Sequence, residues 1–150
     1  MKSLQAAERE IIETFETFET IDEKYAYLFQ IGESLPPMDP KLKTDETLVK
    51  GCQSSLWFHL TRDGERFSLK ADSDSLVIKG ISALLVKLIE GRTADEILSI
   101  NMDFIDQLAI WKLASERNSG LMAMLTHIHA HARAEQSPHK SESVDSQQEG

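Results

Sequence analysis

The spacing of apolar positions predicts helices in the first part of the chain. Apolar side chains recur there every three or four residues, which is typical of amphipathic helices packed on a core. The pattern predicts one helix over 4–18 and a second from about 21 to 32, with Thr20 and Glu23 in capping-box positions at its start. A proline-rich segment at 36–40 then ends the helical pattern.

The middle of the chain alternates between apolar and polar residues, with the period of a β-strand. Alternation over 56–61 and again over 67–71, with Asp63-Gly64 between them, predicts an antiparallel hairpin buried on one face. A further short strand is expected at 47–50, directly before a loop that leads into the hairpin. The sheet is therefore expected to have three strands.

The pattern returns to helices after the hairpin. The most apolar segment, 76–90, predicts a central helix on the sheet, and Gly80 inside it indicates close packing against a neighbour. Two short helices are expected at 94–99 and 103–110, followed by a last helix over 117–132. These elements predict a single α+β domain, and 150 residues are enough to form one domain with a sizeable core.

The end of the chain has a different composition. From Glu135 onward it consists mainly of Ser, Gln, Glu and Lys, with almost nothing to bury. We therefore expect a folded domain over 1–134 and a disordered polar tail over 135–150.

Composition argues against several classes of function. The chain carries 25 acidic and 16 basic side chains, a formal net charge of −9, so no basic surface for nucleic acid is expected. No apolar run is long enough to cross a bilayer, and the amino terminus lacks the apolar core of a secretory signal. We expect no nucleic-acid or membrane partner and a cytoplasmic location.

The single cysteine, Cys52, is the main candidate for chemistry. It follows Gly51 and precedes Gln53, Ser54 and Ser55, a composition typical of a loop, where functional side chains concentrate. A free cysteine is also among the most commonly buried residues, so an inert core thiol is the alternative. A lone cysteine cannot form an internal disulfide or a Cys-x-x-Cys redox pair.

The histidines offer no clear base or metal site. Strand rise places His59 roughly 20 Å from Cys52, so a base would have to come from elsewhere in the fold. His127 and His131 have a spacing that can bind a metal, but no acidic residue completes the motif, and an exposed polar face is the simpler interpretation. The other histidines are His129 and His139. We expect no metal and no cofactor, and a loop thiol of this kind is suited to carry a group between proteins.

Several short motifs occur in order from about Phe15 to about Ile128. They are Glu23-Lys24-Tyr25, Leu35-Pro36, Val49-x-Gly51-Cys52-Gln53-Ser54-x-x-Trp57, Asp72-Ser73-Asp74, Lys79-Gly80 and Arg117-x-x-Gly120-Leu121. In this order they resemble the SufE family, the sulfur-acceptor proteins of iron–sulfur cluster assembly, and Gln53-Ser54 is more similar to the SufE branch than to the CsdE branch. Leu56 and Glu116 depart from the family's usual valine and serine.

The resemblance implies a small antiparallel sheet packed against helices, similar to the IscU-type scaffold. It implies that Cys52 attacks the terminal sulfur of a persulfide on a cysteine desulfurase, a pyridoxal-phosphate enzyme. Cys52 would then carry the persulfide, stimulate the desulfurase and deliver sulfur to an iron–sulfur scaffold, as a sulfurtransferase. The alternative is a non-catalytic adaptor or activator of the desulfurase.

The resemblance carries a catalytic role over to Cys52 alone. We hypothesise that its loop keeps the thiol against apolar neighbours at rest and swings out on docking. Arg117 is expected either to serve the loop or the partner, or to have a plain surface or capping role, while Asp72 and Asp74 are expected to be helix caps. A monomer and a homodimer are both compatible with the sequence.

Overall fold

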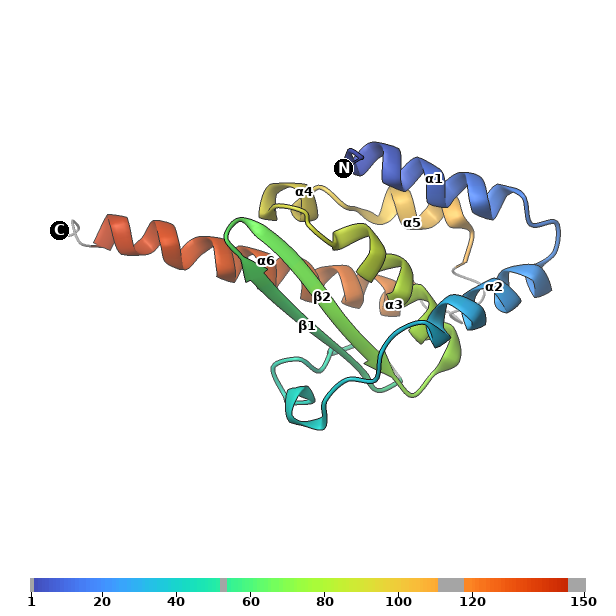
Figure 1. The fold of residues 1–150 in the computed structure, drawn as a ribbon, viewed down its shortest axis with the longest axis horizontal. Coiled ribbons are helices and arrows are strands. Elements are labelled where there is room, and N and C mark those ends of the chain that lie inside the picture. Colours follow the sequence, from blue (N-terminus) through green and yellow to red (C-terminus); the bar gives the residue numbers. More distant parts are fainter. Residues whose placement is uncertain (1, 52–53, 111–117, 146–150) are drawn as a thin grey trace.

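The computed structural model of the chain describes residues 2–51, 54–110 and 118–145, and in the last range it describes the side chains of 121–135. The elements, in chain order, are α1 (Leu4–Glu16), α2 (Ile21–Glu33), a 3₁₀ turn (Pro40–Leu42), β1 (Leu56–Asp63), β2 (Arg66–Ser73), α3 (Leu76–Ile89), α4 (Ala94–Leu98), α5 (Met102–Leu108) and α6 (Asn118–Asp145). The α+β class is confirmed. Figure 1 shows the hairpin with α3 and α6 beside it and α1, α2 and α5 farther away.

The hairpin packs one face on the core. β1 and β2 pair antiparallel from Leu56 opposite Ser73 to Asp63 opposite Arg66. The inward residues of both strands are buried, and α3 packs on β2 while α6 packs on β1. Gly64, with φ of 66°, begins the two-residue turn, the position at which a type II′ hairpin requires glycine.

The prediction of a third strand at 47–50 is wrong. Within the described residues the sheet has two strands, and Leu48 forms only an isolated bridge to Trp57. The preceding chain is closed into a turn, because the Thr47 hydroxyl donates to the Leu42 carbonyl at 2.6 Å and the Leu48 amide donates to the Thr44 carbonyl at 3.0 Å. Few residues are therefore left to run beside β1.

The expected helix starts are confirmed by their caps. The Thr20 hydroxyl accepts from the Glu23 amide, and the Glu23 carboxylate accepts from the Thr20 amide, which completes a capping box at α2. Thr93 and Glu96 form the same box at α4, and Ser75 caps α3 by accepting from the Ile78 amide at 3.2 Å. These short polar contacts satisfy amides that the helices cannot pair internally.

The crossing of α2 and α3 is unusually close. A Cβ built on Gly80 would overlap the Leu28 carbonyl oxygen and lie 2.7 Å from the Leu28 Cβ. A Cβ built on Gly32 would lie 3.1 Å from the Gly80 nitrogen. Gly80 therefore lets the two backbones touch, which confirms the close packing expected from its place inside an apolar helix.

A buried arginine ties the end of α3 to the amino terminus. Arg92 is 4% exposed, and its guanidinium donates to the carbonyl oxygens of Leu88 at 3.1 Å and Lys2 at 2.8 Å. Glu96 lies 3.6 Å away and compensates the charge. The buried guanidinium of Arg92 thus joins the end of α3 to the amino-terminal segment, about ninety residues away in the sequence.

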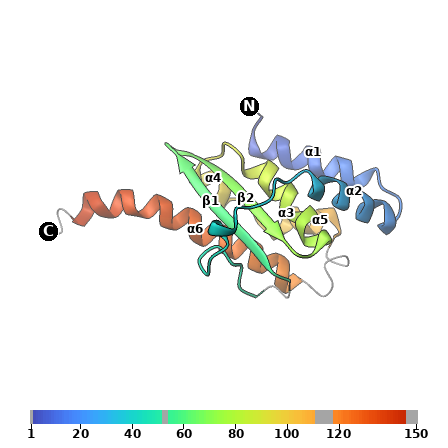
Figure 2. The same ribbon diagram turned by 60° about the horizontal axis from the view of Figure 1, so that its bottom comes forward.

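The last helix is longer than the apolar pattern predicts. α6 continues to Asp145, although apolar spacing ends near Ala132, and Figures 1 and 2 show its carboxyl-terminal part extending beyond the hairpin. The division into a domain over 1–134 and a tail over 135–150 stays a prediction. In the described ranges, no helix has the length and apolarity that a bilayer crossing requires.

Replacing Gly80 with alanine tests the helix crossing. We expect Gly80→Ala to lower the free energy of unfolding by about 2–3 kcal/mol, because overpacking outweighs the gain in helix propensity. Urea denaturation measures the change. Gly64→Ala is the contrast, since its Cβ meets nothing within 4 Å and only its positive φ is strained. A Gly80→Ala protein as stable as the parent would contradict the close crossing.

Candidate functional site

The chain that leads toward the cysteine is held against β1. The Val49 amide donates to the Leu56 carbonyl at 2.8 Å, and the Phe58 amide donates to the Thr47 carbonyl at 2.8 Å. Val49 is 3% exposed and belongs to the core. The incoming arm is therefore fixed up to the residue before Lys50.

The chain that leaves the cysteine loop is held by the end of β2. The Ser55 amide donates to Asp74 Oδ1 at 3.1 Å, and the Asp74 amide donates back to the Ser55 carbonyl at 3.2 Å. The Ser73 hydroxyl donates to the same carbonyl at 2.7 Å and accepts from the Ser75 amide at 3.1 Å. One serine side chain thus links the outgoing arm to the residue that caps α3.

Asp72 anchors a different segment. It accepts from the Met38 amide at 3.3 Å and pairs with Lys43 at 3.3 Å and Lys79 at 3.7 Å. Burial acts to raise the pKa of Asp72, but hydrogen bonds from the Met38 and Ser73 amides and the hydrogen bond and charge of Lys43 outweigh it, so the pKa lies below its usual value. The expectation that Asp72 and Asp74 cap a helix is wrong, because Ser75 caps α3 and both carboxylates bind loops.

Gly51 brings the loop onto α6. Its φ is 87°, and a Cβ built on it would lie 3.4 Å from the Ala123 Cβ. The positive φ favours glycine at this position, while a Cβ 3.4 Å from Ala123 would make an ordinary van der Waals contact. The last described residue before Cys52 therefore rests on the first part of α6.

One turn farther along α6 lies a histidine that sequence reasoning did not connect with the loop. His127 stacks on His131 with ring centroids 4.2 Å apart and contacts the Phe58 ring edge-on at 6.1 Å. Both histidines are half-buried, and His127 Nε2 is buried with no hydrogen-bond partner in the described part of the chain. The interpretation of His127 and His131 as an exposed polar face is wrong.

The electrostatics of His127 keep it neutral. Burial, and then the neighbouring His131, lower its pKa to about 4, and Lys50 on the incoming arm acts in the same direction. His59 instead lies on the hairpin face away from the core side chains, half-buried. No cluster of three or more metal-binding side chains occurs among the residues for which the structure gives positions.

Two large apolar side chains are exposed beside the loop's contacts. Leu76, the residue after the α3 cap, is 61% exposed, and Met122, next to Ala123, is 53% exposed. Single exposed apolar side chains are common on protein surfaces, so neither residue by itself marks an interface. No pattern in the sequence separates these two residues from buried ones.

Two residues singled out from the sequence, Cys52 and Arg117, lie outside the described residues. The geometry given above is therefore that of the frame around Cys52. This frame consists of an incoming arm on β1, an outgoing arm on β2 and α3, and a floor on α6. This frame fixes the chain on either side of the segment that contains Cys52.

Comparison with known proteins gives a consistent result. The family model "SufE: Fe-S metabolism associated domain" matches residues 9–132. The chain is 37% identical over 145 residues to SufE-like protein 1, chloroplastic/mitochondrial, of Arabidopsis thaliana, covering 92% of this chain and only 39% of that longer protein. It is 30% identical over 129 residues to an uncharacterized SufE-like protein of Rhizobium meliloti, covering 82% of this chain and 92% of that protein.

The fold is also similar to a solved structure. The solution structure of a hypothetical protein from Thermus thermophilus aligns with a TM-score of 0.72 at 20% identity, over 85% of this chain and 94% of that one. At this identity the likeness concerns the fold alone.

The outgoing arm can be loosened at one hydroxyl. We expect Ser73→Ala to speed hydrogen exchange at the Ser55 and Asp74 amides by roughly fivefold, because a neutral hydrogen bond contributes about 1 kcal/mol. Exchange measured by NMR checks this. Ser68→Ala is the matched control, since Ser68 lies on the same strand and bonds Glu90 at 3.1 Å instead. Equal rates at Ser55 in both variants would contradict the anchoring role of Ser73.

The pKa of His127 predicts a loss of stability in acid. Its pKa is about 4 when folded against 6.5 as an ordinary histidine, so the unfolded chain binds more protons between these values. Stability should therefore fall as the pH is lowered from about 6.5 to about 4. Since the side chain is half exposed, we expect His127 to account for about 1 kcal/mol of that fall.

Urea denaturation at several pH values measures the effect. His127→Leu should make the free energy of unfolding less dependent on pH in this window. Thr126→Leu, at an exposed neighbouring position of the same helix, should leave the dependence as it is. The same slope in the His127→Leu protein and the parent would show that the histidine is not held neutral by the fold.

Proposed function

Because the chain belongs to the SufE family and so has a part in iron–sulfur metabolism, we propose that Cys52 accepts persulfide sulfur from a cysteine desulfurase. In this proposal the protein also stimulates the desulfurase and passes the sulfur to an iron–sulfur scaffold. The observation that carries the proposal is that the only cysteine of a SufE-family chain falls in a segment whose two arms are both anchored.

The proposed transfer needs only the thiol of this chain. The Cys52 thiolate attacks the outer sulfur of the desulfurase persulfide, forming a new S–S bond as the old one breaks. The desulfurase cysteine leaves as a thiolate, and Cys52 becomes the persulfide. Oxidation states balance across the two cysteines, so neither an oxidant nor a reductant is required.

The anchored arms support delivery of the thiol to a partner. A group that must reach into another protein benefits from a fixed base close by, because a long flexible segment loses more entropy when it is ordered. Contacts through Val49 and Ser55 provide such a base on either side of Cys52. Docking of the desulfurase would also cover Leu76 and Met122, which removes their apolar surface from water.

The surroundings of the thiol bear on its reactivity. His127 is uncharged near neutral pH, and Lys50 stands two positions before Cys52 in the sequence, so we propose Lys50 as the cation that stabilises a thiolate in this loop. A reducing compartment keeps a lone thiol available, and we propose the cytoplasm as the setting.

The first test is an intact mass of the protein after incubation with a cysteine desulfurase and L-cysteine, taken without reductant. We expect a gain equal to one sulfur atom. Cys52→Ser should abolish the gain, and Ser54→Ala, two positions away, should keep it.

Desulfurase turnover in the same samples separates the two functions that the family suggests. If Cys52 carries sulfur, Cys52→Ser loses both the added mass and the stimulation that depends on sulfur removal. If the protein is a non-catalytic adaptor, no mass is gained and Cys52→Ser stimulates as well as the parent. The second result would overturn the carrier proposal and leave family membership intact.

A further inference from the structure

A groove opens between α1, α2 and α3, away from the cysteine loop. Its volume is about 430 Å³, within the range of small-molecule sites. The α3 residues that line it, Ala83 to Lys87, lie about 10–16 Å along the helix from Leu76, which is beside the loop. The groove is therefore separate from the frame described above.

The walls of the groove are mainly apolar. The lining side chains come from all three helices and from the chain after α2. They are Ile11, Ile31, Leu35, Pro36, Ala83, Leu84 and Val86, with Glu10, Thr14, Tyr27, Ser34 and Lys87 as the polar members. An elongated apolar group would find contacts on both sides of the space.

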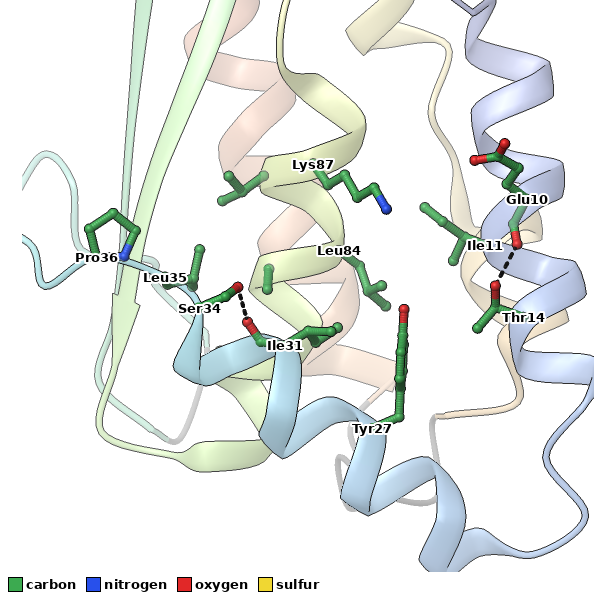
Figure 3. A pocket seen from close by; sticks show the side chains of 12 residues that line it. Glu10, Ile11, Thr14, Tyr27, Ile31, Ser34, Leu35, Pro36, Leu84 and Lys87 are labelled. Atoms are coloured by element: carbon green, nitrogen blue, oxygen red, sulfur yellow. Dashed lines mark hydrogen bonds between the residues drawn. The ribbon is translucent and has the colours of Figure 1, made fainter.

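Two polar groups in the groove have no partner in the described part of the chain. Figure 3 shows the Lys87 amine and the Tyr27 hydroxyl both pointing into the space between α3 and α1. By contrast, the Thr14 hydroxyl donates to the Glu10 carbonyl at 3.0 Å and the Ser34 hydroxyl donates to the Ile31 carbonyl at 2.5 Å. In the described part of the chain, the Lys87 amine and the Tyr27 hydroxyl are thus free to donate to a ligand, whereas the hydroxyl protons of Thr14 and Ser34 are already donated to carbonyl oxygens.

The charge at the rim favours an anion. Glu10 is the carboxylate that lines the groove, and it is already paired with Lys2 at 2.9 Å. Lys87 is exposed and makes no ion pair within the part of the chain for which side chains are described. Screening over about 8 Å makes these near charges count for more than the net charge of the whole chain.

From this geometry we propose that the groove binds a small monocarboxylate with an apolar body, such as a medium-chain fatty acid. The carboxylate pairs with Lys87 and accepts from the Tyr27 hydroxyl, and the hydrocarbon lies against Ile31, Leu84 and Val86. Both free donors are thereby satisfied, and the apolar walls are removed from water. A cation would be repelled by Lys87, and an uncharged chain would gain no ion pair with the exposed ammonium of Lys87.

Titration of the full chain with octanoate, followed by amide chemical shifts, tests the proposal. We expect shifts at the groove residues of α1, α2 and α3, with octanol binding roughly tenfold more weakly because it lacks the charge. Acetate and octylammonium should cause no shifts there. Lys87→Met should lower the affinity for octanoate to that for octanol. Lys70→Met, at an exposed position of β2, should leave the affinity for octanoate unchanged.

A second variant tests the apolar part. Val86→Trp fills the groove from a half-buried position and should abolish the octanoate shifts while the rest of the spectrum stays dispersed as in the folded parent. Equal binding of octanol and octanoate, or full octanoate affinity in the Lys87→Met protein, would overturn the assignment of the carboxylate to Lys87. Shifts that spread over other surfaces and persist in Val86→Trp would overturn the site itself.

Discussion

The contact between Gly80 and Leu28 sets the distance between α2 and α3, and much of the molecule is arranged on that pair of helices. α3 carries the densest set of buried side chains, and it packs against the hairpin on one side and against α2 on the other. Because Gly80 has no side chain, the backbones of α2 and α3 are in van der Waals contact at this point. Any side chain at position 80 would push the two helices apart. The start of α3, which anchors the cysteine loop, depends on the same packing.

The loop frame shows how a small sheet can hold a functional segment. The sheet has two strands in the described ranges, which are few for an independent sheet, and helices stabilise this hairpin from its apolar face. The ends of the strands nearest the cysteine then make additional contacts through Asp74 and Ser73, whose side chains bind backbone groups of the loop. The contacts described here are thus made by residues on the two arms beside the cysteine.

Sequence patterns predicted most of the helices and the hairpin, since these depend on local signals. Each of these signals lies within a few residues of the element that it predicts. Examples are the capping boxes at Thr20 and Thr93, the turn at Gly64 and the apolar run of α3. The missing third strand had the right composition, but hydrogen bonds of Thr47 to the preceding turn decided its backbone. A pattern of apolar and polar residues does not contain that information.

The parts of the site that the sequence did not predict are contacts between distant segments. His127 and Phe58 lie on different elements, and nothing near either residue indicates that α6 will cross β1. Asp74 is a residue type that often caps helices. It holds the loop instead because its carboxylate accepts a hydrogen bond from the Ser55 amide, and Ser55 lies far from it in the sequence. Cys52 was found because it is the only cysteine and its neighbours form motifs, which are properties of the sequence alone.

Arg92 has a consequence for how the chain is made. During synthesis the amino-terminal helix leaves the ribosome long before the residue whose guanidinium binds the carbonyl of Lys2. α1 also packs on α3 and α5, so until these helices emerge its apolar face, with Ile11, Ile12 and Phe15, is only partly covered. The nascent chain must therefore keep the rest of this face in solution while the segments up to α5 are made, a task to which the exposed glutamates of α1 are suited.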